Sequence, residues 1–232
     1  MKQATGNNTP DGLKKLSIQI GLNGFSFSIS GAGSGDFRSL FYPHFDLRYL
    51  MGVEQRLSQE FQAVEAGWST DMVTLVPVEI FDENMARQYM QAANMLCEGT
   101  TTLYCRPPGA FLVAVWQAGT AMLEAVREFY PGAYHYHYLL TGIEVSRRDT
   151  IEVILLSDTA HIKVYNSSGL FAAETARYTS FDDILWYVKK LSGGDSYSQY
   201  KFNLISPDFT EAAGFFSAYY RNFELFDLPG SL

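Results

Sequence analysis

The sequence predicts an α/β protein built from two halves, each a mixed sheet covered by helices. Apolar and polar residues alternate over several short segments, which is the period of half-buried strands. Other segments carry apolar residues at the spacing of one helix face. An order of three strands, a helix, a strand, a helix and more strand occurs twice, although the two halves share negligible sequence identity. A meander of strands followed by alternating helices and strands indicates a mixed sheet in each half.

Three strands are predicted at the start of the first half. Apolar and polar residues alternate over 16–20 and again over 25–29. Between these segments stands Asn23-Gly24, a dipeptide typical of a tight hairpin turn. Segment 37–42 predicts the third strand, so the three strands should form an antiparallel meander.

A helix is expected over 46–66, because apolar residues recur there at helical spacing and Gly67 follows as a stop signal. The remaining elements predicted for this half are a strand at 72–76, a helix at 83–96, strands at 101–106 and 110–116, and a helix over 118–129. Segment 134–147 stays open, because most of it fits both a strand and a helix.

The second half repeats this order. Its predicted elements are strands at 151–156, 161–165 and 170–175, a helix at 181–191, a strand at 202–205, a helix at 208–219 and a strand at 223–226. Ser180 is placed to cap the first of these helices, with Asp183 three residues further on. We therefore expect a flexible tail over 1–14, a first half over 15–148 and a second half over 149–232.

Composition and charge exclude several classes of protein. Hydrophobic residues make up 47% of the chain, which supplies a core, and the charged fraction of 18% argues against disorder. The net charge of −8 and the lack of a basic run argue against a nucleic-acid partner, because phosphate binding needs a basic patch. Apolar runs are too short to span a bilayer, and the N-terminus has no apolar segment typical of a signal peptide. We expect a cytoplasmic protein without membrane contact. Its two cysteines, Cys97 and Cys105, could pair in space, but two reduced, buried thiols are favoured.

The opening segment Leu16-Ser-Ile-Gln-Ile-Gly-Leu-Asn-Gly-Phe-Ser-Phe-Ser-Ile29 resembles a domain-of-unknown-function family of Bacteroidetes proteins. That family is associated with the actin-like ATPase fold and has no assigned activity. The twofold order of elements likewise resembles the duplicated ribonuclease-H-like fold of the actin-like ATPases, over the whole chain after the tail. The resemblance implies two ribonuclease-H-like halves, with ATP bound in the cleft between them.

The nucleotide motifs that the resemblance implies are altered in this sequence. The first hairpin normally carries Asp-x-Gly, in which the Asp helps to hold hydrated Mg²⁺ and the Gly lets the backbone approach phosphate. Gln19-Ile20-Gly21 stands there instead, and a neutral Gln is a poor partner for a hard cation. The second hairpin keeps one acidic residue, Asp158, but no glycine. After the strand at 202–205 a Gly-Gly pair is expected to receive adenosine, yet Ser206-Pro207 is found, and Pro lacks an N–H donor.

Other constellations favour structural roles. His135 and His137 would share one face if their segment is a strand. They lie among tyrosines, without further ligands at metal-site spacing, so we expect no metal site. Carboxylate pairs at 82–83 and 182–183 precede predicted helices, where the helix dipole favours negative charge. Neither cysteine lies in a nucleophile motif. Aromatic residues are dense in the last third of the chain and suit core packing or a protein interface: Tyr187, Tyr197, Tyr200, Phe215, Phe216, Tyr219 and Tyr220.

The sequence therefore favours a non-catalytic, degenerate ATPase that acts through protein–protein contacts, with itself as a homodimer among the partners considered. It predicts no catalytic residue and no cofactor. The alternative is a divergent enzyme that binds or hydrolyses ATP, with Gly21, Asn23 and Asp158 around the phosphates of Mg-ATP. A cleft for another small molecule stays open as well, because a fold alone does not define a function.

Overall fold

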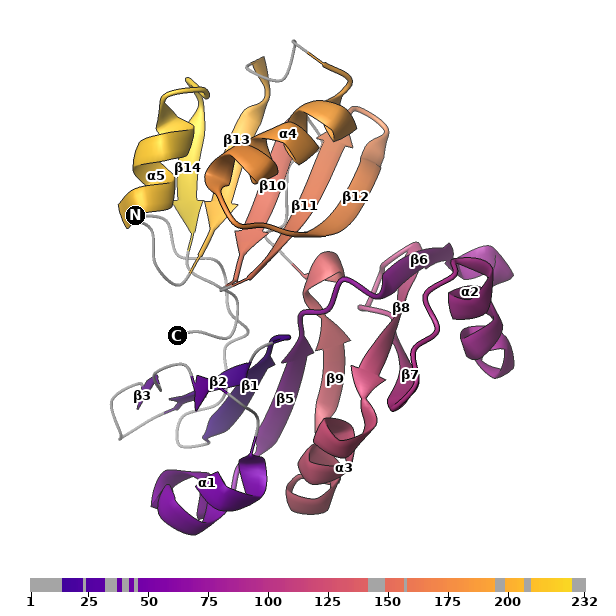
Figure 1. Cartoon of the computed structure of the whole chain (residues 1–232), viewed down its shortest axis with the longest axis vertical. Coiled ribbons are helices and arrows are strands. Elements are labelled where there is room, and N and C mark those ends of the chain that lie inside the picture. Colours follow the sequence, from indigo (N-terminus) through magenta and orange to yellow (C-terminus); the bar gives the residue numbers. More distant parts are fainter. Residues whose placement is uncertain are drawn as a thin grey trace. The chain divides into compact units, whose positions relative to one another are not determined.

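The computed structural model describes residues 14–22, 24–31, 37–38, 42–43, 46–141, 149–156, 158–194, 199–206 and 210–226. The chain divides into two compact units, a first unit that ends at Leu140 and a second unit that begins at Thr141 (Figure 1). The predicted tail lies outside the described residues up to position 13.

The first unit contains a mixed sheet with the strand order β3-β2-β1-β5-β9, and β4 also pairs with β2. Its strands are β1 (Lys15–Ile20), β2 (Gly24–Ser30), β3 (Phe37–Arg38), β4 (Tyr42–Pro43), β5 (Ala63–Trp68) and β9 (Tyr134–His137). The central strand β1 is antiparallel to β2 and parallel to β5, which is parallel to β9. Residues 39–41 of the predicted third strand lie outside the described residues.

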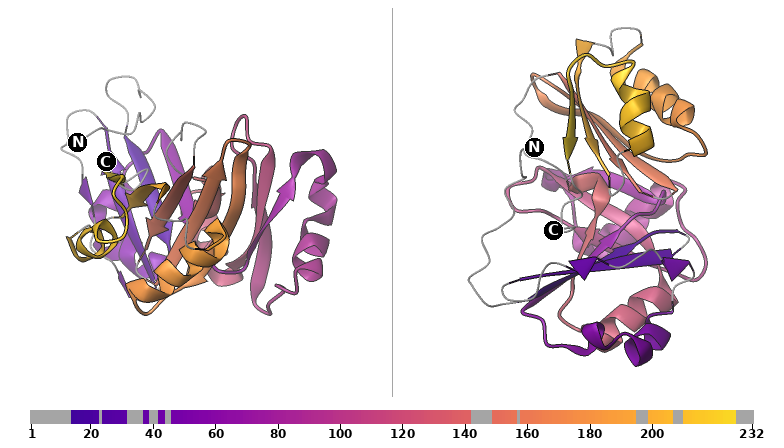
Figure 2. Two further views of the ribbon diagram at one scale, coloured as in Figure 1. Left: turned by 90° about the horizontal axis from the view of Figure 1, so that it is seen from above. Right: turned by 90° about the vertical axis from the view of Figure 1, so that its left-hand side faces the viewer.

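Helices α1 (Leu47–Val53) and α3 (Thr120–Phe129) lie on one face of this sheet (Figure 2). The face of β1 that carries Leu16, Ile18 and Ile20 is buried, as the alternation predicts. Short 3-10 helices complete the unit, at Gln55–Ser58, Val78–Ile80, Glu83–Met85 and Tyr138–Leu140.

A three-stranded antiparallel sheet is inserted between β5 and α3. Its strands are β6 (Val73–Pro77), β7 (Thr100–Cys105) and β8 (Leu112–Gly119), in the order β6-β8-β7, and α2 (Ala86–Ala92) packs on it. Val76, Met90, Val113 and Val115 form the centre of a separate small core. The predicted strands and helix at 72–116 are confirmed with shifted ends, but they form this insertion instead of extending the main sheet.

The second unit has the strand order β12-β11-β10-β13-β14. Its elements are β10 (Thr150–Leu155), β11 (Thr159–Asn166), β12 (Gly169–Arg177), α4 (Phe181–Ser192), β13 (Lys201–Ile205), α5 (Thr210–Ser217) and β14 (Phe223–Phe226). Both helices cover one face of the sheet (Figures 1 and 2), and their apolar residues pack on Ile151, Val153 and Phe202. Positions 208 and 209 of the last predicted helix lie outside the described residues.

Both main sheets share one topology, which confirms the predicted duplication. In each, a three-stranded meander places its first strand in the middle, and two parallel strands extend the sheet from that strand. The predicted capping of α4 is also confirmed, because Ser180 and Asp183 form a reciprocal capping box.

The predicted helix over 46–66 is wrong in its second part. Helix α1 ends at Val53, because Glu54 adopts an extended conformation, and 63–68 form β5 beside β1. The apolar spacing in this segment was compatible with a helix, but parallel pairing with the central strand buries Ala66 and Trp68. Local periodicity does not reveal such a distant partner.

Gly67 has a role other than the predicted helix stop. It lies inside β5 opposite Tyr136 of β9, and a Cβ atom there would lie 2.7 Å from Cζ of Tyr136. A glycine within a strand often marks such a close approach.

Segment 134–147, which the sequence leaves open between a strand and a helix, forms β9 followed by a 3-10 turn. Its residues 142–147 lie outside the described residues.

Candidate functional site

Two hairpin turns occupy equivalent positions in the two units. Each follows the six-residue central strand of its sheet, β1 or β10. In the first turn, the amide of Gly21 donates a hydrogen bond to the carbonyl oxygen of Gly24 at 2.9 Å. In the second, the amide of Leu156 donates to the carbonyl oxygen of Thr159, also at 2.9 Å. The two turns are therefore closed by the same backbone bond, and they are the hairpins expected to meet phosphate.

The side chain of Gln19 forms a hydrogen bond within the first hairpin. Gln19 stands where the resemblance to the actin-like ATPases implies an Asp. It is buried, and its Oε1 accepts a hydrogen bond from Oγ of Ser26 on the paired strand at 2.9 Å. A Cβ atom at Gly21 would make an ordinary van der Waals contact, 3.6 Å from the carbonyl oxygen of Gly24. Asn23, a candidate phosphate ligand, lies outside the described residues.

The second hairpin carries Asp158 in its turn, half-buried. Thr159 Oγ1 donates to Asp158 Oδ1 at 3.5 Å, and the amide of Tyr178 donates to the Asp158 carbonyl oxygen at 3.4 Å. The Tyr178 hydroxyl donates to the carbonyl oxygen of Leu156 at 2.7 Å, so this residue clamps the turn against the end of β12. Burial, and then the charge of Asp158, raise the pKa of Tyr178. Sequence analysis missed Tyr178, because nothing in the sequence distinguishes it from its many aromatic neighbours.

The chain just after β13, where the resemblance implies a Gly-Gly pair that receives adenosine, continues the sheet. The amide of Ser206 donates to the carbonyl oxygen of Phe226 on β14 at 3.3 Å, and Ser206 is buried. This amide is already used by the protein. Pro207 lies outside the described residues.

The described side chains of the two hairpins offer few ligands for the Mg²⁺ of the nucleotide that the resemblance implies. A hard divalent cation is held through carboxylates and water. The first hairpin offers the neutral amide of Gln19, whose oxygen already accepts from Ser26, and the second offers the single carboxylate of Asp158.

The two histidines of β9 are held by neutral hydrogen bonds. His135 Nδ1 accepts from the indole N–H of Trp68 at 3.2 Å. The ring of His137 is fully buried: its Nδ1 accepts from the amide of Leu139 at 3.1 Å, and its Nε2 lies 3.0 Å from the carbonyl oxygen of Thr70. Nδ1 is an acceptor, so the proton of this neutral ring is on Nε2.

Burial sets the protonation of these histidines and of the cysteine nearby. It lowers the pKa of His137 to about 3, and it lowers the pKa of His135 to about 4 with a further contribution from Arg127. The expected burial of both cysteines is wrong for Cys97, which is exposed, and correct for Cys105. Burial raises the pKa of the Cys105 thiol to about 11, so a reactive thiolate is disfavoured there at neutral pH. In the part of the chain that the structure describes, no three His, Cys, Asp or Glu residues are grouped to hold a metal ion.

The carboxylate pairs near helix starts act as caps, as predicted. Asp82 accepts from the amide of Asn84 at 2.9 Å. Asp183 accepts from the amides of Thr179 and Ser180, each at 2.9 Å, and these bonds lower its pKa. In each pair, the capping carboxylate is thereby held at the start of a helix.

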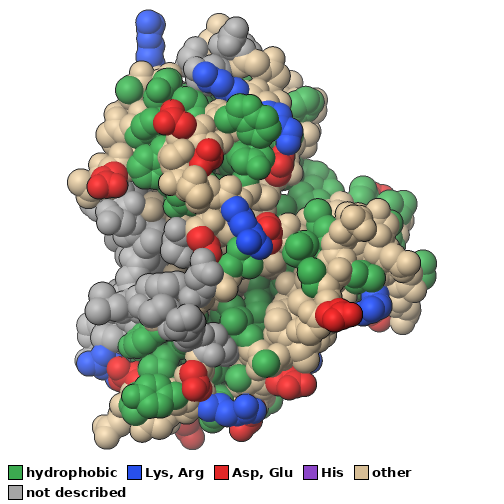
Figure 3. All heavy atoms as spheres, viewed as in Figure 1, with side chains coloured by type: hydrophobic (Ala, Val, Ile, Leu, Met, Phe, Trp, Pro, Cys, Tyr) green, Lys and Arg blue, Asp and Glu red, His purple; other side chains and the backbone are tan. Residues whose placement is uncertain are grey.

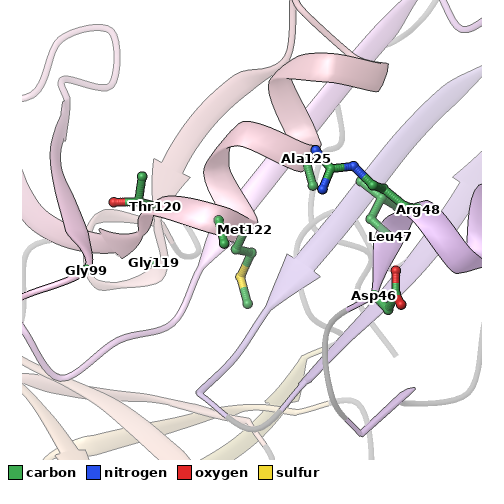
Figure 4. Close-up of a pocket in the computed structure, with 9 residues that line it drawn as sticks. Asp46, Leu47, Arg48, Gly99, Gly119, Thr120, Met122 and Ala125 are labelled. Carbon is green, nitrogen blue, oxygen red and sulfur yellow. The ribbon is translucent and has the colours of Figure 1, made fainter.

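An open cavity of about 350 Å³ lies in the first unit, between the start of α1 and the start of α3 (Figure 4). Its polar side chains already have partners within the unit. Arg48 reaches from α1 toward α3, where its Nη2 lies 2.6 Å from Oε2 of Glu128. Asp46 caps α1, and Thr120 Oγ1 lies 2.9 Å from Thr101 Oγ1. Neither Gly21 nor Asp158 lines this cavity.

Within the described ranges, each helix is too short or too polar to cross a bilayer.

The duplicated topology and the paired hairpins define a protein with the actin-like ATPase fold. A protein of unknown function from Bacteroides thetaiotaomicron, described as having that fold, superposes with a TM-score of 0.71 at 17% identity over 97% of this chain and 94% of the other. The cytoplasmic domain of EpsL, an inner-membrane component of the type II secretion system of Vibrio cholerae, superposes with a TM-score of 0.51 at 11% identity, over 94% and 92% of the two chains. At such identities the likeness concerns the fold.

The chain belongs to the DUF3822 family of proteins of unknown function, whose family model matches residues 3–192. The predicted family resemblance and fold are thereby confirmed. No curated protein matches the sequence significantly.

Proposed function

We propose that this protein is a non-catalytic member of the actin-like ATPase fold that acts through protein–protein contacts. One observation carries the proposal: the oxygen of Gln19, at the position of the metal-binding Asp, accepts a hydrogen bond from Ser26 within its own hairpin. This pair stabilises the hairpin and leaves the site with a neutral group where a cation needs charge.

Two further observations support the same function. The amide of Ser206 donates a hydrogen bond to the carbonyl oxygen of Phe226. The position at which the actin-like ATPases receive adenosine therefore continues a strand pair here. The fold also occurs in a component of a multiprotein assembly, the EpsL domain of the type II secretion system. A fold retained without its nucleotide chemistry is consistent with a role in contacts.

A divergent ATP-binding or ATP-hydrolysing protein is the alternative. One observation favours it: Asp158 lies in the turn of the second hairpin, where the fold family carries an acidic residue, and the first turn keeps Gly21. In this alternative, Gly21 lets the backbone approach phosphate, and Asp158 meets a metal-bound water.

Calorimetric titration of the full chain with Mg-ATP and with Mg-ADP tests the proposal. We expect no saturable heat at millimolar nucleotide, and no nucleotide-dependent rise in melting temperature, because ligand binding to the native state would stabilise it. Saturable binding at micromolar nucleotide, or phosphate release above the buffer rate, contradicts the proposal and supports the alternative.

Two variants then identify the site if nucleotide binds. Asp158→Asn keeps the shape of the side chain and removes its charge, so the alternative predicts loss of metal-dependent binding. Gly21→Ala places a methyl group at the turn in ordinary contact with the protein, 3.6 Å from the carbonyl oxygen of Gly24. Weakened binding in both variants, with unchanged melting temperatures, locates the nucleotide at the hairpins. Unchanged binding removes these residues from the site.

A further inference from the structure

Helix α4 of the second unit has one buried face and one face turned to solvent. Ile184, Leu185 and Val188 belong to the core of the unit. Asp182, Trp186 and Lys190, spaced four residues apart, are exposed and follow one another along the outer face. We call these three residues the α4 stripe.

Trp186 is the centre of the α4 stripe and is 58% exposed. Its ring stands edge-on to Tyr187 with the centroids 4.9 Å apart. Lys190 Nζ lies 5.5 Å from the centroid of the Trp186 ring and 3.3 Å from both carboxylate oxygens of Glu174 on β12. These contacts orient Trp186 and Lys190, and an exposed tryptophan is a frequent anchor of protein interfaces.

The surface around the stripe combines apolar and charged groups. Figure 3, seen from the side on which α4 lies in Figure 1, shows hydrophobic side chains of the second unit gathered among acidic and basic ones. A non-obligate interface is about as apolar as the rest of a protein surface, and its aromatic centre surrounded by a polar rim distinguishes it.

The order of charges along the stripe indicates the partner. The acidic Asp182 precedes Trp186 by four residues, and the basic Lys190 follows it by four residues. If two copies of α4 cross antiparallel on a twofold axis at Trp186, Asp182 of each copy faces Lys190 of the other. A twofold interface has to be self-complementary in this way.

We propose that a second copy of this chain docks on the α4 stripe, with the two α4 helices antiparallel. This proposal rests on the proposed function, because it names a partner for a protein that acts through contacts. A helix of 12 residues is about 18 Å long, so the shared surface is small. Small interfaces belong to transient complexes, and we therefore expect a dimer whose population rises with protein concentration.

Sedimentation equilibrium of the full chain, over concentrations up to millimolar, tests the proposal. Trp186→Ala removes the central ring and should raise the dimer dissociation constant about thirtyfold, as expected for an interface anchor. Phe171→Ala is the matched control: Phe171 is another exposed aromatic residue of the same unit, on β12 and outside the stripe, and its removal should leave the constant unchanged.

A charge-exchange experiment tests the antiparallel geometry. Asp182→Lys and Lys190→Asp each place like charges face to face and should each weaken the homodimer about tenfold or more. An equimolar mixture of the two variants should restore association, because both cross-pairs are then opposite in charge. Each change also opposes the helix dipole, and Lys190→Asp removes the pair with Glu174, so melting temperatures are measured for both. Restoration on mixing cannot come from an unfolded variant.

Three results overturn the proposal: a monomer at every concentration, a dimer unchanged in Trp186→Ala, or folded charge variants that do not associate on mixing. The nucleotide titration separates this inference from the proposed function. A monomer that binds no nucleotide overturns docking on α4 alone, whereas a dimer that binds Mg-ATP overturns the non-catalytic function alone.

Discussion

The two main sheets share a topology but fill equivalent central positions with different chemistry. In β1, Ser17 is paired with Ser28 of β2. At the same step of β10, Glu152 is paired with Lys163 of β11, and the two form an ion pair. All four residues are buried. One backbone arrangement thus accommodates either two small hydroxyls or two opposite charges, which shows that topology alone does not determine the side chains at this position.

The charged version depends on both partners. A buried ion pair is strongly destabilised when one member is removed, because the remaining charge stays out of water without compensation. Lys163 Nζ also donates to the carbonyl oxygen of Thr141, so its loss leaves that acceptor without this donor as well. Removing one serine of the Ser17–Ser28 pair in the first unit would leave no buried charge.

Exchanging the pair for that of the first unit gives the largest expected effect. Lys163→Ser or Glu152→Ser alone should lower the free energy of unfolding by about 4 kcal/mol, since each leaves one buried charge. The double variant, which reproduces the Ser17–Ser28 pair, should lose less than either single variant. Urea unfolding of the three variants measures this. Losses that simply add in the double variant would mean that the two charges do not interact.

A second difference concerns the parallel strands. Gly67 of β5 lies opposite Tyr136, whereas the equivalent position in β13 is Ile205, opposite Phe226. At this strand position the second unit thus has the aliphatic side chain of Ile205. In the first unit, tyrosine rings occupy the space beside Gly67. The Tyr136 ring is buried and stands edge-on to Tyr138, so it has little freedom to move away.

Gly67→Ala should therefore destabilise the first unit by about 3 kcal/mol, the upper range for overpacking a filled site. The added methyl would lie 2.7 Å from Cζ of Tyr136. Gly21→Ala is the control, since its methyl group would lie 3.6 Å from the carbonyl oxygen of Gly24, and it should change stability little. Thermal unfolding of both variants compares them. Equal stability of the two variants would contradict the close packing described for β5 and β9.

The first unit also carries the buried neutral ring of His137, which makes its stability depend on pH. Burial depresses the pKa of this ring to about 3 in the folded state, against an ordinary value near 6.5. Above pH 6.5 the ring is neutral whether the protein is folded or not. Below pH 6.5, the His137 ring becomes protonated in the unfolded chain but stays neutral in the folded chain. The free energy of unfolding therefore falls as the pH drops toward 3.

By pH 5 this residue alone should account for a loss of about 2 kcal/mol relative to pH 7. His135, whose pKa is lowered to about 4, adds to the same trend, less strongly because it is more exposed. His137→Gln should flatten the curve of unfolding free energy against pH between 7 and 5, whatever its effect at pH 7. Urea unfolding at several pH values measures that slope, and an unchanged slope would mean that another group controls it.

The second unit was predictable from the sequence nearly element by element. Its strands alternate clearly, its turns are short, and Ser180 with Asp183 marks the start of α4 by a local capping pattern. The first unit was less predictable, because β5 is defined by its partner β1 rather than by its own periodicity. Gly67 shows the same limit: the sequence favours a helix stop, and only the Tyr136 ring across the strands gives its physical reason.

The candidate site was predictable in part. Strand alternation locates the first hairpin, and pairing of Gln19 with Ser26 follows from its register. The clamp by Tyr178 was not predictable, since it joins the turn to the end of a strand about twenty residues further on. The role of Gln19 as an internal acceptor likewise needs side-chain positions. Whether these hairpins meet nucleotide stays a prediction.

Amide hydrogen exchange of the two hairpins, with and without saturating Mg-ATP, tests the non-catalytic function most directly. The peptides to follow are those over 18–27 and 153–162, which contain the turns at Gly21 and Asp158. The proposed function predicts the same exchange rates in both conditions, because no phosphate covers either turn. Slower exchange at both turns when Mg-ATP is present would contradict it and would show that the family fold still binds nucleotide here.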